Sequence, residues 1–210
     1  MKLGDKIRPM EPPIPAGQYL GHIVGVLDLG EQYSDLYKNY SNKLCFTFEV
    51  CGQTHEVDGK TVTRDLSKTL SVAAKAGSKC RTFFDGLAGK THTDEEYKEI
   101  DPFSFLGMPV ALQIVLSEDQ QHNNIMSVTP VPPFVPSIPP RTLPMFRFDT
   151  AQWDDKQFEA LPEWAKERLK KSTEYQQLHP STDALQIAPQ PVQQFPGFAP
   201  VEQESAVIPF

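Results

Sequence analysis

The clearest hydrophobic pattern in this chain is an alternation in the segment Lys43-Leu-Cys-Phe-Thr-Phe-Glu-Val50. Every second residue from Leu44 to Val50 is apolar, and the residues between them are Cys45, Thr47 and Glu49. A period of two predicts a half-buried strand, because successive side chains of a strand point to opposite faces. Phe46 and Phe48 are therefore expected in the core.

Other segments carry comparable strand signals. Glycines at 21 and 25 predict a bend or bulge in the first strand. Asp58-Gly59 is a strong hairpin signal, so the second and third expected strands form a long hairpin. Val110, Leu112, Ile114 and Leu116 alternate in a later segment. The expected strands cover residues 18–28, 43–50, 60–70, 107–116 and 124–131.

One helix is predicted between the third and fourth strands, over residues 78–87. Ser78 suits the N-cap, and four apolar residues can form an inward stripe: Cys80, Phe83, Phe84 and Leu87. Residues 93–97 predict a further short turn of helix. The order of three strands, a helix and two strands predicts an all-β fold, the five-stranded OB-fold barrel, which binds ligand on its second and third strands and adjacent loops. An SH3-like barrel is the main alternative, although it usually lacks this helix.

Prolines cluster in residues 130–144 and 180–210, which marks linkers. Between these clusters, Asp154-Asp155 and the apolar residues Phe158, Leu161 and Trp164 predict a short helical unit. Its role is docking on the barrel, self-association or binding of a replication partner, and we favour the first two because its aromatic side chains would otherwise be exposed. The expected organisation is an N-terminal extension (1–16), a nucleic-acid-binding domain (17–131), a Pro-rich linker (132–153), the helical unit (154–178) and a disordered tail (179–210).

The net charge of −7 across 210 residues is distributed unevenly. Residues 40–81 hold seven bases and four acids, whereas residues 82–131 hold two bases and eight acids. A polarised domain can carry one electropositive groove and repel nucleic acid elsewhere. Three cysteines without a C-x-x-C motif argue against a disulfide framework and fit a reducing cytoplasm. No secretory signal or membrane span is predicted.

Candidate DNA contacts are exposed aromatics, on which bases stack, and bases that contact phosphates. Three tyrosines precede the second strand, where their spacing also fits one face of a short packed helix. Strand alternation places Arg64 and Lys68 on the same face as their apolar neighbours. Either a bulge turns the two bases outward or they lie at the ends of the barrel. The candidate contacts are Tyr33, Tyr37, Lys38, Tyr40, Lys43, Arg64, Lys68, Lys75, Lys79 and Arg81.

Signals for enzymatic activity are weak. Cys51 and His55 have a spacing seen in metal sites, but no second pair completes one. No Walker, G-x-S-x-G or H-E-x-x-H motif occurs, and the acids of 94–101 lack a paired basic or metal context. No catalytic residue, metal or other cofactor is therefore expected.

The last residues place Glu202 and Glu204 ahead of a terminal Ile208-Pro209-Phe210. This tip, on a Pro/Gln-rich tail, resembles that of bacterial single-stranded DNA-binding proteins. Residues 17–131, with the segments GQYLGHIVGVLDLGEQ, LCFTFEV, DLSKTLSV and GMPVALQIVLS, are similar to the barrel of phage-type members. Ala206-Val207 stand where the bacterial family has acids, which predicts weaker electrostatic docking to a bacterial-type partner.

The resemblance implies a non-enzymatic protein of a phage or prophage in the bacterial host cytoplasm. It would coat single-stranded DNA during replication or recombination, and its tip would recruit replication or recombination proteins. The alternative is a phage structural or interaction protein whose barrel binds another protein. A nucleic-acid-modifying enzyme is the third hypothesis, which the missing catalytic residues disfavour.

Overall fold

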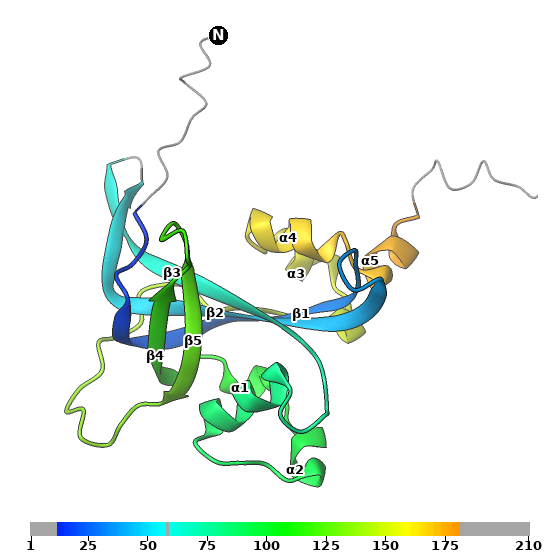
Figure 1. The fold of residues 1–210 in the computed structure, drawn as a ribbon. Helices are drawn as coiled ribbons and strands as arrows, with labels where there is room; N and C mark the ends of the chain where they lie inside the picture. Colours follow the sequence, from blue (N-terminus) through cyan, green and yellow to red (C-terminus); the bar gives the residue numbers. More distant parts are fainter. Residues whose placement is uncertain (1–11, 58, 181–210) are drawn as a thin grey trace, which may run out of the picture. The chain divides into compact units, whose positions relative to one another are not determined.

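The computed structural model describes residues 12–57 and 59–180 (Figure 1). These belong almost entirely to the first of two units, Met1–Leu178; of the second, His179–Phe210, only two residues are described. The strands are β1 (Gly17–Ser34), β2 (Asn39–Val57), β3 (Lys60–Ser71), β4 (Pro109–Leu116), β5 (Asn123–Pro130) and β6 (Phe146–Phe148). The helices are α1 (Lys79–Ala88), α2 (Asp94–Lys98), α3 (Asp155–Glu159), α4 (Glu163–Leu169) and α5 (Thr173–Leu178), with 3-10 turns at Pro102–Phe105 and Thr150–Gln152.

The fold is mixed but mostly β, with one six-stranded sheet in the order β3-β2-β1-β4-β5 and β6 beside β1. All pairings are antiparallel except that of β6 with β1. The expected strand order and the helix after β3 are confirmed. A closed barrel is not found among the described strands, because β3 and β5 share no backbone ladder. Instead, the Lys68 ammonium donates a hydrogen bond to the carbonyl of Ile125.

The main core lies on the face of the sheet that α1 covers. The predicted alternation in β2 is confirmed, with Phe46 and Phe48 fully buried. The expected stripe of α1 is also confirmed, and the Phe83 ring centroid lies 4.8 Å from that of Phe46. Ser78 caps this helix by accepting a hydrogen bond from the Arg81 backbone N–H at 3.2 Å.

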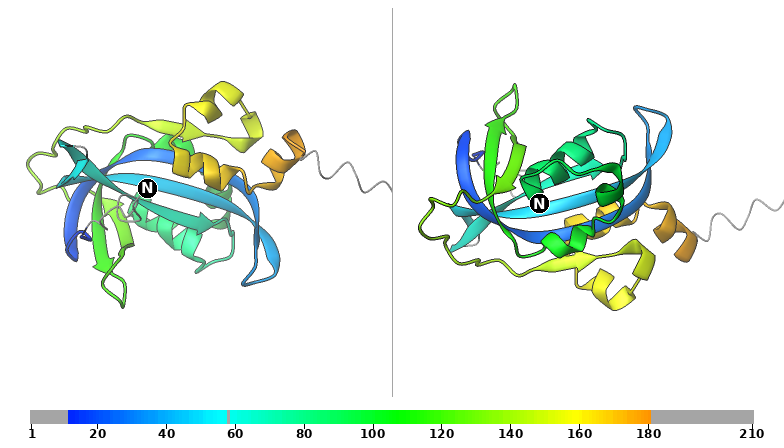
Figure 2. Two further views of the ribbon diagram at one scale, coloured as in Figure 1. Left: turned by 90° about the horizontal axis from the view of Figure 1, so that it is seen from above. Right: turned by 90° about the horizontal axis from the view of Figure 1, so that it is seen from below.

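A second core lies on the opposite face of β1 and β2, beneath the short helices, and includes Phe148 of β6 (Figure 2). Its buried residues are Leu27, Leu29, Cys45, Phe148, Phe158, Leu161, Ala165 and Leu169. The helical unit therefore docks on the sheet, which is one of the two roles expected for it. β2 is consequently buried on both faces, and the prediction of a half-buried strand is wrong for its middle.

The docking of β6 depends on the absence of a side chain at Gly25. Gly25 is the register partner of Phe146, and a Cβ at this position would lie 2.3 Å from the Phe146 ring. The β1–β2 register also shifts between Ile23 and Gly25, which confirms the expected irregularity. A glycine here leaves room for the Phe146 ring against β1.

Candidate nucleic-acid interface

Residues 32–41, which we call the arm, form the end of the β1–β2 hairpin. The expected loop is only a four-residue turn, and its tyrosines lie on strands and a turn, so the interpretation as a packed helix is wrong. Tyr33, Tyr37 and Tyr40 are 47%, 74% and 60% exposed. The rings of Tyr33 and Tyr40, which are register partners, lie 5.1 Å apart at 56°. The arm therefore presents three aromatic rings to solvent.

The base of the arm is attached to the C-terminal helices. The β1–β2 register shifts between Asp28 and Glu31, and Gly30 in this bulge has a φ of 67°. The carboxylate of Glu174, in α5, accepts hydrogen bonds from the Glu31 backbone N–H at 3.0 and 3.1 Å. Gln32 donates to the backbone carbonyl of Arg168 at 3.0 Å. These hydrogen bonds fix the orientation of the arm relative to the C-terminal helices.

The two bases nearest to the arm differ in their surroundings. Lys38, in the turn, is 72% exposed and lies 3.9 Å from the carboxylate of Asp35, an ion pair that solvent weakens. Lys43 follows on β2 and donates to the Ser71 hydroxyl at 2.6 Å. Because Tyr40 and Lys43 are three residues apart, their side chains leave opposite faces of β2.

Lys68 and Lys79 line a groove between β3, α1 and β5, which we call the β3–β5 groove. It encloses about 730 Å³, and its lining includes Phe83, Ile125 and Met126. Lys68 is the register partner of Phe46 and thus lies on the core-facing side of β3. This differs from both expectations, which were a bulge that turns it outward or a position at the end of the barrel. Burial lowers the pKa of its ammonium, and the neighbouring Lys79 lowers it further.

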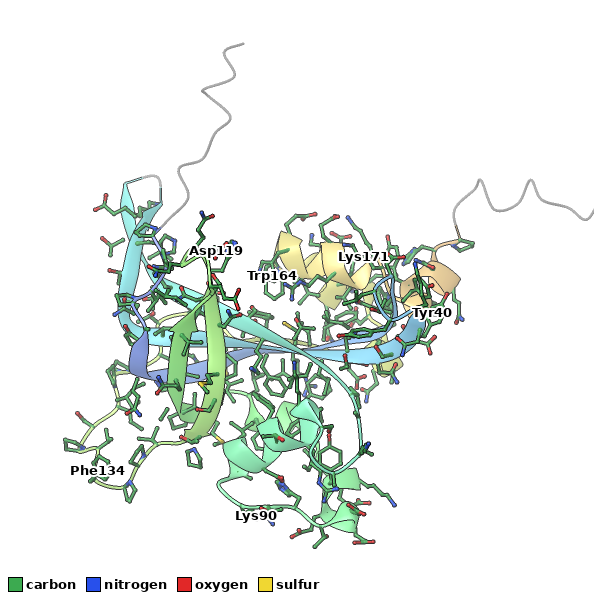
Figure 3. The ribbon with its side chains drawn as sticks, in the orientation of Figure 1. Tyr40, Lys90, Asp119, Phe134, Trp164 and Lys171 are labelled. Carbon is green, nitrogen blue, oxygen red and sulfur yellow. The ribbon has the colours of Figure 1, made fainter. Side chains whose placement is uncertain are left out.

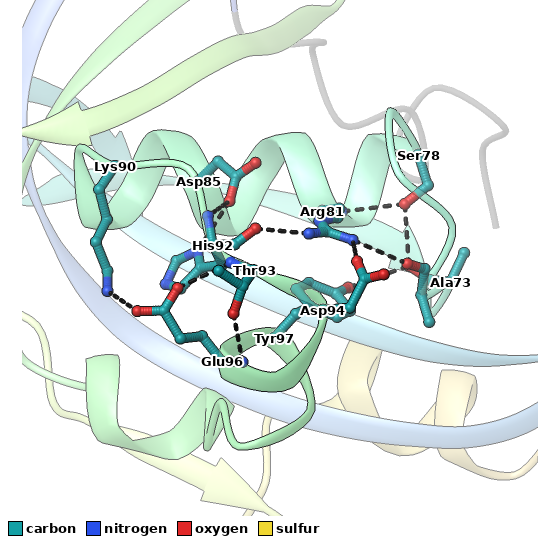
Figure 4. A network of polar contacts seen from close by, with 11 residues as sticks. Ala73, Ser78, Arg81, Asp85, Lys90, His92, Thr93, Asp94, Glu96 and Tyr97 are labelled. Atoms are coloured by element: carbon teal, nitrogen blue, oxygen red, sulfur yellow. Dashed lines mark hydrogen bonds and ion pairs between the residues drawn. The ribbon is translucent and has the colours of Figure 1, made fainter.

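Three other candidate bases lie elsewhere. Arg64 lies where the β2–β3 register shifts, and its guanidinium donates to the Pro12 carbonyl at 2.7 Å. Lys75 is exposed in the loop before α1. Arg81 is buried, so its prediction as a phosphate contact requires correction. Its guanidinium bonds the carboxylate of Asp94 and the backbone carbonyl of His92 (Figure 4).

The same network holds the carboxylate of Asp85, which accepts hydrogen bonds from the His92 backbone N–H at 2.9 Å and its ring Nδ1 at 2.8 Å. The backbone hydrogen bond, followed by the imidazole, lowers the pKa of Asp85. A carboxyl group whose pKa is lower in the folded state than in the unfolded state stabilises the fold. This stability is fully present above the pKa of the unfolded state, about 3.9, and is lost as the pH falls through the pKa of the folded state.

We therefore expect Asp85→Asn to reduce the free energy of unfolding at pH 7, and the difference from wild type to shrink as pH falls below about 4. Urea unfolding at a series of pH values measures this difference. Asp35→Asn is the matched control, because the Asp35 side chain is 94% exposed. A difference that stays constant from pH 7 to pH 3 would contradict the assignment.

The ten predicted contacts do not form one continuous groove. The described structure groups them at the arm, at the β3–β5 groove and at isolated positions. Sequence reasoning also missed Arg168, on α4, which donates to the Thr69 hydroxyl of β3 at 2.8 Å. The nearest signal in the sequence was the base-rich segment 166–171, which had no predicted connection to β3.

Comparisons with protein-family models, curated proteins and solved structures found no match. Within residues 12–57 and 59–180, no group of three or more His, Cys, Asp or Glu side chains is arranged to hold a metal ion. None of the described helices is long and apolar enough to cross a membrane. The predicted tip, with Glu202, Glu204, Ile208, Pro209 and Phe210, lies outside the described residues, as does the predicted disorder of the tail beyond Pro180.

Proposed function

We propose that this chain binds single-stranded DNA of a phage or prophage during replication or recombination. The observation that carries the proposal is the exposure of three tyrosines on an arm whose base is held by α5. Base stacking on an aromatic ring contributes about 1–3 kcal/mol and tolerates any sequence. The exposed Lys75 and Lys79 supply charge for phosphates.

The arrangement of strands supports a relationship to the OB-fold as part of this proposal. The sheet order β3-β2-β1-β4-β5, with a helix between β3 and β4, is that of an OB-fold barrel opened between β3 and β5. Lys68 reaches across this opening to Ile125. OB-folds bind single strands with basic grooves and stacking aromatics.

The test is a fluorescence titration with poly-dT at two salt concentrations, in which affinity should fall steeply as salt rises. Tyr37→Ala should weaken binding by about 1–3 kcal/mol, because a stacking ring is lost. Thermal stability should stay the same, since Tyr37 is 74% exposed. Leu36→Ala, at the neighbouring position with 80% exposure, is the control that should leave DNA affinity unchanged.

A second candidate function is binding of another protein, which Leu36 favours. Leu36 and the three tyrosines are exposed together at the end of the hairpin, and a cluster of exposed apolar side chains is a feature of protein contacts rather than phosphate contacts. This second function would replace the first if two results are obtained. The wild-type protein would not bind poly-dT, and Leu36→Ala would lose a protein complex that the wild type forms.

The proposal also includes recruitment of replication or recombination proteins through the terminal Ile208-Pro209-Phe210. The Phe210 ring would enter an apolar pocket while the terminal carboxylate pairs with a base of the partner. Adding one residue after Phe210 should therefore abolish capture of these proteins from a bacterial lysate and leave poly-dT affinity equal or higher. Equal capture by the extended chain and by the chain that ends at Phe210 would refute this part.

A further inference from the structure

Arg168 is fixed above the outer face of β2 and β3, although it belongs to the C-terminal helices. Its guanidinium Nη1 donates to the Thr69 hydroxyl at 2.8 Å and to the Cys45 sulfur at 3.6 Å. Thr69 and Cys45 are register partners on the two strands. The neighbouring Leu169 is fully buried in the second core, which holds this end of α4 against the sheet.

Lys43 lies on the same face as Cys45, two residues earlier on β2. Two residues along a strand span about 7 Å, so Lys43 and the Arg168 site are neighbours. The Lys43 ammonium donates to Ser71, and Arg168 donates to Thr69, so both cations lie against exposed hydroxyls on the outer face of β3. The sheet pairs β3 only with β2, which leaves this surface at the sheet edge.

Trp164 adds an aromatic ring to this surface. The guanidinium carbon of Arg168 lies 5.3 Å from the Trp164 ring centroid, and the rings of Trp164 and Phe146 make an edge-to-face contact with centroids 6.2 Å apart at 75°. Figure 3 labels Trp164 on α4, above the sheet, and Lys171 just after the end of this helix. A guanidinium held over an indole keeps its planar set of donors in one orientation.

Arg168 and Lys43 differ from Lys166 and Lys170, two other bases of the C-terminal helices. Lys166 and Lys170 are paired with glutamates of α3 and α4. In residues 12–57 and 59–180, by contrast, no carboxylate lies within ion-pair distance of Arg168 or Lys43. Two cations over one face of β2, one of them beside an aromatic ring and neither paired with a described carboxylate, form a surface suited to a phosphodiester backbone.

We infer that Lys43, Arg168 and Trp164 form a second contact surface for the backbone of single-stranded DNA, assembled from β2 and α4. This inference rests on the proposed function and assigns part of it to the C-terminal helices. The tyrosine arm would stack bases, whereas this surface, on the other side of β2 from Tyr40, would bind phosphates and fix the path of the strand.

The test compares Arg168→Ala with Lys171→Ala, which removes an exposed charge just after the C-terminal end of α4. Arg168→Ala should weaken poly-dT binding about 3- to 10-fold at low salt and reduce the slope of log affinity against log salt by about 0.7, the value of one phosphate contact. Lys171→Ala should retain the wild-type affinity and the wild-type salt slope. Arg168→Lys should restore the slope, because the charge remains.

Tryptophan fluorescence gives a second readout. Trp153→Phe leaves Trp164 as the only tryptophan, and its emission should change on adding poly-dT; Trp164→Phe, which leaves Trp153, should show a much smaller change. If wild type binds poly-dT but Arg168→Ala matches it and Trp164 emission is unchanged, the inference is overturned and the proposed function stands. If the wild-type protein does not bind poly-dT, the proposed function and this inference are both wrong.

Discussion

Phe148→Ala is expected to lower the free energy of unfolding by about 3–5 kcal/mol, the usual cost of removing a buried phenylalanine ring. Phe148 is 1% exposed, and its ring centroid lies 4.8 Å from that of Trp153 and 6.1 Å from that of Phe158. Little of this loss can be recovered by repacking, because rings on several sides hold the cavity open. Urea unfolding, followed by circular dichroism, measures the change.

Phe134→Ala is the matched control, since Phe134 lies in the Pro-rich segment before β6 and is 83% exposed (Figure 3). Its unfolding free energy should stay within about 0.5 kcal/mol of wild type. Equal stabilities of the two variants would mean that residues 146–178 contribute nothing to the cooperative fold. This result would contradict the assignment of a second core.

Glu49→Gln is expected to destabilise the protein by about 3 kcal/mol, because a buried carboxylate with several hydrogen bonds is replaced by an amide that can accept at only one oxygen. Glu49 is 1% exposed, and its oxygens accept from the backbone N–H of Thr142 at 2.9 and 3.0 Å and of Leu143 at 2.7 Å. The amide group of glutamine would present a donor to these donors. The carboxylate therefore fastens the end of the Pro-rich stretch to β2.

The control is Glu56→Gln, the same change at an exposed position of the same strand. Thermal unfolding of both variants provides the measurement, and proteolysis near residue 142 shows whether the attached segment is released. A Glu49→Gln protein as stable and as resistant as Glu56→Gln would mean that these hydrogen bonds add no net stability.

The sequence predicted well the elements whose signals are local. Alternation places Phe46 and Phe48 in the core because the period of two is a property of the extended backbone itself. Ser78 begins α1 because its hydroxyl can satisfy a backbone N–H within the first turn. Neither inference needs knowledge of distant residues.

The candidate site was predicted less well, because its members depend on contacts that span the chain. Arg81 has the same side chain as an exposed base, but Asp94 and His92 enclose its guanidinium. The three tyrosines were predicted in the loop between the first two strands, but Tyr33 and Tyr40 lie on the strands themselves, because the β1–β2 ladder extends to the turn.

The sequence by itself determined the positions of most strands, the helix after β3, its inward stripe and the apolar face of β2. Only the tertiary structure decided that the other face of β2 is also buried, since Cys45 and Glu49 look like solvent-facing residues until residues 142–169 cover them. It also decided that Lys68 faces the core side, where the gap between β3 and β5 gives its ammonium a carbonyl partner. The physical reason is that local pattern reports which face a side chain leaves, whereas burial and charge pairing depend on what the rest of the chain brings to that face.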